Sequence, residues 1–350
     1  MRTAETNAVD LLALFSEGLD DPVIAAESLG GGRNSQVYRL VCQRSHRYVA
    51  KRYFSPAGEA RNRLEVEFSS LQFLWRHGIR CVPRPILANR AQEYAVCEYI
   101  EGRTISSKEV TDADLDEAVR FLERLKALRA SPESLDLPPA SEACFSVDAL
   151  VNVIDRRLER LRALGQEEVL AQGLQDFLVS EFVPSFHQIV LWCKTVLRES
   201  GLSFSAEIAV NERTLSPSDF GFHNALRRRD GHLCFLDFEY FWWDDPAKMI
   251  ADVLLHPAME LQERDRHWFA TQMFRVFQDH ERLAKRLEVL WPLCGLNWCL
   301  IFLNEFVPEH RLRRGFAGGQ LLSGTKVLAE QLVKAKQMLH TILGRYEHFP

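Results

Sequence analysis

Ser218-Asp-Phe-Gly-Phe-His-Asn224 and, shortly after it, Leu236-Asp-Phe-Glu239 carry the most specific pattern in this sequence. Asp219 stands five residues before Asn224, and Asp237 ends an apolar run. Each residue alone is typical of a turn or a strand end. Together they supply a carboxylate for an attacking hydroxyl and hard oxygen ligands for Mg²⁺, the groups that phosphoryl transfer needs. The spacing therefore predicts a catalytic base at Asp219 and metal ligands at Asn224 and Asp237.

A glycine cluster lies upstream, in Leu29-Gly-Gly-Gly-Arg-Asn-Ser-Gln-Val-Tyr38, and leads directly into a predicted strand. Glycines let backbone amides approach phosphate oxygens, and a neighbouring polar side chain adds a donor. We therefore expect Gly31, Gly32, Asn34 and Ser35 to contact nucleotide phosphates. An ordinary hairpin turn is the competing interpretation. The cluster lacks the Gly-Lys-Ser/Thr ending of a P-loop, which disfavours a Walker-type NTPase.

Lys51 ends Val49-Ala-Lys51 on the next predicted strand. A strand lysine in this position can bind the α- and β-phosphates when a helix carboxylate holds it. Glu67 is the first choice for that carboxylate and Glu65 the second, both on a helix predicted over 65–77. The alternatives are a lysine that extends from an edge strand to solvent and glutamates on a solvated helix face.

The hydrophobic pattern changes along the chain. The segments 36–41, 47–54 and 94–99 read as strands, since polar and apolar residues roughly alternate. From Thr111 onward the period is helical, and no helix is predicted in 215–252. The helices are expected at 112–129, 147–164, 170–200 with a break or kink near Pro184, 264–291 and 321–343. This order predicts an α+β, two-lobed fold, with a strand-rich lobe over 1–97, a hinge over 98–103 and a helical lobe over 104–350.

Composition excludes several classes of protein. With 43 basic and 48 acidic residues the formal net charge is −5, so the chain lacks the basic excess of a nucleic-acid binder. The eight cysteines are scattered, and Cys294 and Cys299 are assigned to apolar packing rather than zinc. No signal-peptide pattern is present at the N-terminus, and the apolar stretch 293–303 is too short to span a bilayer. We expect a cytoplasmic protein with reduced thiols and no nucleic-acid or membrane partner.

With these motifs the chain resembles the aminoglycoside phosphotransferase and choline kinase family, which shares the protein-kinase fold, over roughly residues 29–252. The resemblance implies ATP and Mg²⁺ as cofactors and a hydroxyl of a small molecule as acceptor, such as a sugar, an amino alcohol or an aminoglycoside-like compound. It also implies roles for single positions: Asp219 as base, Asn224 and Asp237 as magnesium ligands, Lys51 and Glu67 as the phosphate-binding pair, and the backbone of Glu98 and Ile100 at the adenine edge.

The chain departs from the family pattern just before Asp219. The family has His-Gly there, and this sequence has Pro217 and Ser218. His223 is the nearby residue that can take over the missing histidine's bracing role. Glu239 is a candidate ligand of a second metal ion, or a residue that orients the ligands of the first metal ion. Asp245-Pro246 resembles the family's structural turn, with Asp252 nearest to its usual following aspartate.

Two rival functions remain. A protein kinase is disfavoured because Asp237 opens no Asp-Phe-Gly motif and no Ala-Pro-Glu follows. A nucleotide-binding pseudokinase or interaction module stays open because of the Pro217-Ser218 replacement, although the joint presence of the lysine and the three polar ligands counts against it. The aromatic run 240–243 is assigned equally to acceptor stacking and to core packing. The acceptor, the choice between ATP and GTP and the oligomeric state are not specified by the sequence.

Overall fold

The computed structural model describes residues 8–30, 34–55, 62–164, 171–318 and 324–347. The chain forms two compact units. The first unit comprises Met1–Arg103, Leu226–Glu239 and Leu312–Leu321, and the second unit comprises the rest. The first unit thus reaches the predicted hinge and also takes in two later segments that the sequence analysis placed in the helical lobe.

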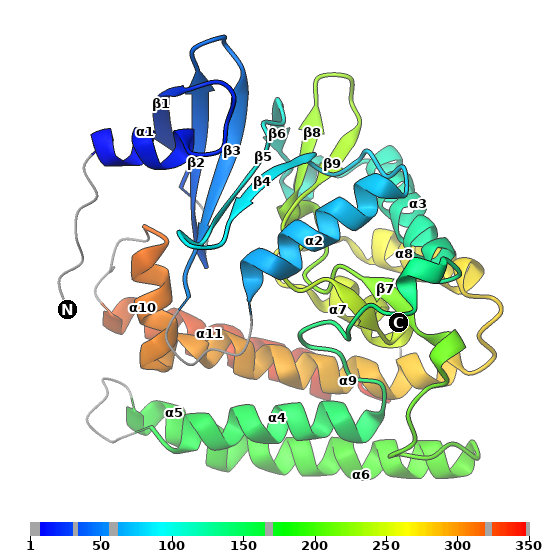
Figure 1. Ribbon diagram of the computed structural model, residues 1–350. Helices are drawn as coiled ribbons and strands as arrows, with labels where there is room; N and C mark the ends of the chain where they lie inside the picture. The colour runs from blue at the N-terminus through cyan, green and yellow to red at the C-terminus, as the bar shows by residue number, and fades with distance from the viewer. Residues whose placement is uncertain (1–7, 31–33, 56–61, 165–170, 319–323, 348–350) are drawn as a thin grey trace. The chain divides into compact units, whose positions relative to one another are not determined.

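A five-stranded antiparallel sheet forms the core of the first unit (Figure 1). Its order is β1-β2-β3-β5-β4, with β1 Val23–Ser28, β2 Ser35–Cys42, β3 Arg47–Tyr53, β5 Tyr94–Glu98 and β4 Pro85–Asn89. The predicted strands at 36–41, 47–54 and 94–99 are confirmed as β2, β3 and β5. Lys51 lies on the central strand β3, opposite Val37 on one side and Ala95 on the other.

Two helices pack against this sheet. Helix α1, Ala8–Ser16, places Phe15 in edge contact with the ring of Tyr94 at 5.2 Å. Helix α2, Arg63–Arg76, begins at the side chain of Asn62, which accepts a hydrogen bond from the Glu65 backbone N–H. It ends before Gly78, which has φ +75° and so suits a helix stop, and the helix predicted over 65–77 is confirmed.

A small three-stranded sheet, β6-β8-β9, belongs mostly to the first unit. It consists of β6 Gly102–Thr104, β8 Ala225–Arg228 and β9 Leu233–Phe235. The backbone N–H of Phe235 donates to the carbonyl of Cys81 at 2.8 Å. This bond holds the end of β9 in the first unit, so the residues after it, Asp237 and Glu239, are positioned there too.

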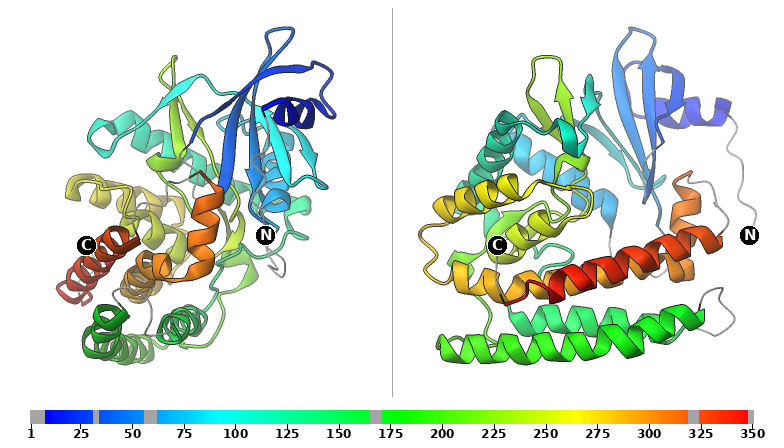
Figure 2. Two further views of the ribbon diagram at one scale, coloured as in Figure 1. Left: turned by 90° about the vertical axis from the view of Figure 1, so that its left-hand side faces the viewer. Right: turned by 180° about the vertical axis from the view of Figure 1, so that it is seen from behind.

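Helices make up most of the second unit. They are α3 Asp112–Leu128, α4 Val147–Arg162, α5 Ala171–Phe177, α6 Val183–Glu199, α7 Pro246–Leu255, α8 Glu263–Val276, α9 Leu283–Phe302, the first residues of α10 Pro308–Phe316, and α11 Gly324–Leu343. Helix α9 is central and lies alongside α4, α7 and α11 (Figure 2). A π-helical turn, Leu178–Phe182, joins α5 to α6 with helical backbone on both sides, and this irregularity lies next to Pro184, where a break or kink was predicted.

Two helix predictions are wrong. The helix expected over 264–291 is two helices, α8 and α9, with a connection around His280. The segment 215–252 was expected to contain no helix, yet α7 begins at Pro246, where the Asp245 side chain accepts from the Ala247 N–H. Nearly every residue of α7 is buried, Lys248 included, so the helix has no solvent-exposed polar face.

Acidic residues at the N-terminus of α3 take part in the start of that helix. Thr111 and Asp114 form a capping box, in which the Asp114 carboxylate accepts from the Thr111 N–H at 2.8 Å. Asp112 pairs with Arg264 at 2.8 Å. These carboxylates therefore stabilise the start of the helix and its contacts. The structure gives them this role rather than the binding of a cationic acceptor.

Core packing accounts for the cysteines and for the apolar helix. All eight cysteines are free thiols, and Cys294 and Cys299 are buried in α9, as expected. Within the described residues, one segment, Leu283–Phe306, is long and apolar enough to cross a membrane, but 72% of its apolar window is buried inside the second unit.

Candidate active site

The ammonium of Lys51 is surrounded by three carboxylates of the first unit. Its Nζ lies 2.7 Å from Glu67 Oε2, 2.7 Å from Asp237 Oδ1 and 3.7 Å from Glu239 Oε2. We call these four residues the lysine cluster. Burial alone would lower the pKa of Lys51, but the charges of Asp237 and Glu67 outweigh it and hold the pKa well above its ordinary value. The lysine is therefore a fixed, inward-facing cation rather than one that extends to solvent.

Glu67, not Glu65, is the helix carboxylate that meets Lys51. Glu67 is on the buried face of α2 and also accepts a 2.7 Å hydrogen bond from the hydroxyl of Tyr53. Glu65 points away and pairs with Arg90 at the surface. The helix period explains why Glu67 and not Glu65 meets Lys51. Residues two positions apart on a helix point in nearly opposite directions, so one glutamate lies on the buried face of α2 and the other on the exposed face.

Glu239 is the most buried member of the cluster, with 1% exposure. Asn34 Nδ2 donates to its Oε1 at 2.6 Å, whereas Oε2 has no hydrogen-bond partner within the described chain. Burial, reinforced by the charge of Asp237, raises the pKa of Glu239 to about 7. Asn34, expected at the phosphates, is thus bonded to a carboxylate that the sequence analysis treated as secondary.

The oxygen atoms of this cluster fit a magnesium ion. Carboxylate oxygens of Glu67, Asp237 and Glu239 lie within 4.8 Å of one another. They are hard donors of the kind Mg²⁺ prefers. Glu239 Oε2 is a buried oxygen that lacks a hydrogen-bond partner in the described residues. Asp237 has φ 65°, a left-handed conformation that aspartate tolerates and that follows directly from the end of β9.

The other predicted nucleotide-binding positions are placed as follows. Ser35 opens β2 and is 3% exposed. Glu98 ends β5 and donates its backbone N–H to the carbonyl of Arg84 at 2.8 Å, and Ile100 follows with 8% exposure. Gly31 and Gly32 lie outside the described residues, so the glycine-loop prediction stays a prediction.

The second unit carries Asp219 on the loop between β7, Thr214–Ser216, and a short turn, Phe222–Asn224. Asp219 Oδ1 lies 3.2 Å from His223 Nε2 and 3.0 Å from His256 Nε2. Burial alone would raise the pKa of Asp219, but the hydrogen bonds from the two histidines outweigh it and place the pKa well below its ordinary value. The carboxylate is therefore ionised at neutral pH.

Backbone geometry explains the residue before Asp219. Ser218 has φ 63°, in the left-handed region where glycine is favoured, and glycine is the family residue at this position. A serine pays about 1–2 kcal/mol there. The Ser218 N–H donates to Ser216 Oγ at 3.1 Å, and its hydroxyl donates to the Tyr240 carbonyl at 3.2 Å. These bonds keep the loop in a glycine-like conformation without glycine.

Asn224 is tied to the same loop. Its Nδ2 donates to the backbone carbonyl of Asp219 at 3.0 Å, which leaves the amide oxygen Oδ1 as the atom available to a metal. A Cβ on Gly221 would lie 2.5 Å from Met259 Sδ and 2.7 Å from His223 Nδ1. Any residue larger than glycine would therefore force these two side chains to move. Local spacing thus brings Asp219 and Asn224 together as the sequence indicated.

His256 is the site residue that sequence reasoning missed. It follows α7, whose existence was itself not predicted, and no local motif marks it. The aromatic run was resolved in part: Phe241 is fully buried, Trp242 is 5% exposed, and Trp243 Nε1 donates to the Ser134 carbonyl at 3.0 Å. Phe241 and Trp242 therefore serve core packing, whereas Tyr240 and Trp243 are half-buried and their assignment stays open.

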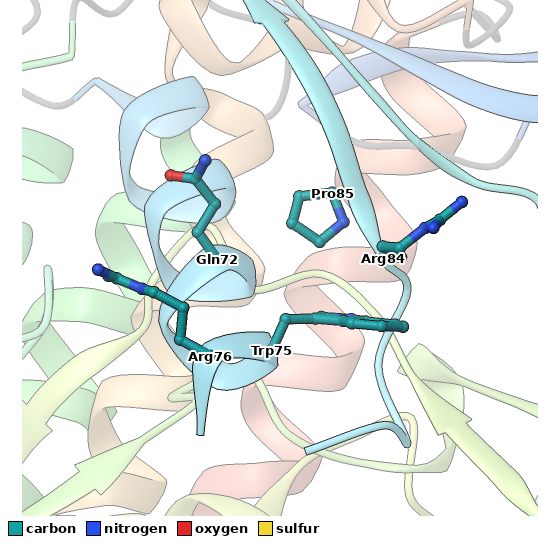
Figure 3. A pocket seen from close by; sticks show the side chains of 5 residues that line it. All are labelled: Gln72, Trp75, Arg76, Arg84 and Pro85. Carbon is teal, nitrogen blue, oxygen red and sulfur yellow. The ribbon is translucent and has the colours of Figure 1, made fainter. Parts of the chain in front are cut away.

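One surface pocket lies elsewhere in the first unit, between α2 and the start of β4 (Figure 3). It has a volume of about 330 Å³ and is lined by Gln72, Trp75, Arg76, Arg84 and Pro85. None of these is a predicted site residue, and Trp75 Nε1 donates to the Pro83 carbonyl at 2.9 Å.

A strand lysine held by a helix glutamate and by a carboxylate after a later strand, together with an Asp–Asn loop, defines a phosphotransferase of the protein-kinase-like fold. The sequence profile described as "Phosphotransferase enzyme family" matches residues 25–286, and the chain belongs to this family.

Solved structures agree with this assignment. Spectinomycin phosphotransferase in complex with ADP and spectinomycin is similar with a TM-score of 0.63 at 10% identity, over 94% of this chain and 98% of that one. Choline kinase from Cryptosporidium parvum Iowa II gives a TM-score of 0.58 at 13% identity, over 91% and 90%. Plasmodium vivax ethanolamine kinase gives 0.57 at 14%, over 93% and 85%. No curated protein matches the sequence.

Proposed function

We propose that this protein transfers the γ-phosphate of ATP to a hydroxyl group of a small molecule in the cytoplasm. The observation that carries the proposal is the lysine cluster: a buried cation held by Glu67 and Asp237 at 2.7 Å each, in a member of a phosphotransferase family. A purely structural buried lysine needs one counter-charge. Here three carboxylates face two cations, Lys51 and Arg63, whose Nε lies 3.7 Å from Glu239 Oε1, so the ionised group keeps one negative charge to attract a divalent cation.

The nucleotide is bound by the first unit in this proposal. Lys51 contacts the α- and β-phosphates and Glu67 keeps its ammonium in place. The carbonyl of Glu98 and the amide of Ile100 meet the adenine edge, and Gly31, Gly32 and Ser35 approach the phosphates. Asn34 contributes to phosphate binding only indirectly, because its amide already donates a hydrogen bond to Glu239.

Asp237 and Asn224 are the proposed magnesium ligands, and Glu239 is a further candidate. A bound Mg²⁺ neutralises the charge that develops on the transferred phosphoryl group. Asp237 and Glu239 supply carboxylate oxygens and Asn224 its amide Oδ1. Glu239 must be ionised to bind a cation, and its raised pKa of about 7 gives its part a pH dependence near neutrality.

Asp219 orients the acceptor hydroxyl and takes its proton. The acceptor oxygen forms a bond to the γ-phosphorus while the bond to the β–γ bridging oxygen breaks, and ADP leaves with that oxygen. A carboxylate with a lowered pKa is a weak base, so its contribution is mainly to align the hydroxyl and to accept the proton late in the transfer.

The similar structures suggest the acceptor class, since by their names three are a choline kinase, an ethanolamine kinase and a spectinomycin phosphotransferase, and a fourth is a complex with gentamicin. We propose a small hydroxyl compound, either an amino alcohol, a sugar or an aminoglycoside-like molecule, and no nucleic-acid or membrane partner.

The test is a screen of amino alcohols, sugars and aminoglycosides for acceptor-dependent ADP release, run with wild type and the Asp219→Asn variant. At least one acceptor should raise ADP release in wild type and not in the variant. ATP binding without acceptor-dependent release for any compound class would favour the pseudokinase alternative.

A further inference from the structure

We propose that His256 is a positioning residue that fixes the carboxylate of Asp219, replacing from the end of α7 the histidine that the family carries at position 217. The inference rests on the proposed function, because Asp219 is its proposed base. Both residues belong to the second unit, where His256 Nε2 lies 3.0 Å from Asp219 Oδ1. His256 is well enclosed, with a side chain 10% exposed.

The hydrogen bonds of His256 fix its tautomer. The backbone N–H of Ala258 donates to His256 Nδ1 at 3.1 Å, so Nδ1 must present its lone pair. A neutral ring then carries its proton on Nε2, and this N–H donates to Asp219 Oδ1. The backbone N–H of Ala258 therefore donates a hydrogen bond to the imidazole, and the imidazole donates one to the carboxylate of Asp219.

The same tautomer argues against a metal ion in this cluster. Asp219 Oδ1, His223 and His256 offer ligand atoms within 4.8 Å of one another, a grouping that can hold a cation. A metal requires the lone pair of Nε2, and a neutral imidazole would then carry its proton on Nδ1, facing the Ala258 N–H. The group is therefore a hydrogen-bonded brace.

Ring contacts hold the brace in orientation. The rings of His256 and His223 stack at 3.9 Å with an interplanar angle of 9°, and the ring of Trp298 on α9 meets His256 edge-on at 4.6 Å. His223 has no comparable second anchor, since its Nδ1 is buried without a partner in the described residues. His256 is thus the better fixed of the two donors.

The brace selects one oxygen of Asp219. Both histidines approach Oδ1, and no described residue hydrogen-bonds to Oδ2. Oδ2 is then the oxygen left to accept the acceptor's hydroxyl proton. The loop can function without the family histidine because the bonds of Ser218 and Asn224 hold its backbone and the histidines hold the Asp219 carboxylate.

The test compares His256→Leu, which keeps a similar volume without a donor, with His256→Gln, whose amide can donate from near the Nε2 position. We expect kcat to fall about 10- to 100-fold in the leucine variant with the KM for ATP unchanged, since misplacing a reacting group costs about this much. The glutamine variant should recover to within about 5-fold of wild type. His267→Gln, on the exposed face of α8, is the matched control and should behave as wild type.

A structural role alone predicts a different pattern. Equal kcat loss in the leucine and glutamine variants, in proportion to lost thermal stability, would overturn the positioning role. In an Asp219→Asn background, His256→Leu should cause no further loss of kcat.

A second readout needs no activity. ¹⁵N NMR of the His256 ring in the wild-type protein should show the Nε2–H tautomer, and a Nδ1–H tautomer would contradict the inference. If the acceptor screen fails while the Nε2–H tautomer is found, the proposed function fails and the brace stands as a structural device.

Discussion

The ammonium of Lys51 lies 2.7 Å from Oδ1 of Asp237. This ion pair joins the centre of the five-stranded sheet to the segment after β9. The same ammonium lies 2.7 Å from Glu67 on α2. A strand, a helix and a later loop of the first unit are therefore held by one cation, and the placement of Asp237 depends on it.

Replacing Lys51 with Ala should lower kcat/KM for ATP by about 100-fold or more, because the phosphate-binding cation is lost. It should also lower the free energy of unfolding by about 3–5 kcal/mol, because Glu67 and Asp237 lose the cation that both of them contact. Steady-state kinetics and chemical denaturation measure the two effects. Lys334→Ala, at an exposed position of α11, is the control; unchanged kinetics in Lys51→Ala would remove the lysine from the site.

Ser218 tests the loop conformation. Ser218→Gly removes the left-handed strain but also the hydroxyl bond to Tyr240, so activity should stay within about 3-fold of wild type. Ser218→Val places a β-branched residue at φ 63° and should lower kcat at least about 10-fold. The pair is compared by kinetics at equal folded fraction, and equal activity in both variants would contradict the strained-loop account.

Asp279 tests the electrostatics of the second unit. Its partial burial would raise its pKa, but hydrogen bonds from Lys126 and Arg129 outweigh this and lower the pKa to about 2. Because the folded pKa lies below the unfolded value of about 3.9, the stabilisation is present above about pH 4 and is lost as pH falls through 2.

Asp279→Asn should therefore destabilise the protein by no more than about 1 kcal/mol at pH 7, since the side chain is 45% exposed and screened by solvent. The difference from wild type should be constant from pH 7 to 5 and shrink below about pH 4. Urea denaturation at several pH values measures it. A difference that grows as the pH falls would contradict the assigned sign.

Local spacing in the sequence predicts those parts of the site that lie within one element or one loop. The helix period separates Glu67 from Glu65, and five residues bring Asn224 back to Asp219. Tertiary contacts were not predictable in this way. Asn34 bonds to Glu239, distant in sequence, and His256 reaches Asp219 from the end of α7, a helix that was not predicted.

The same limit explains the helix errors. The connection between α8 and α9 contains a run of five polar residues, 278–282, without glycine or proline, so no helix-stop residue marks it in the sequence. His280, buried there at 7% exposure, contacts Arg129 of the α3 C-terminus at 2.7 Å, a tertiary contact without a local signal.

The most direct test of the account is the Asp219→Asn variant, measured both for acceptor-dependent ADP release and for ATP affinity. Asparagine keeps the size of the side chain but cannot take a proton, so turnover should fall by at least about 100-fold while the Kd for ATP stays within about 3-fold of wild type. Undiminished turnover, or turnover and ATP affinity lost to the same degree, would contradict the assignment of Asp219 as the residue that receives the acceptor's proton.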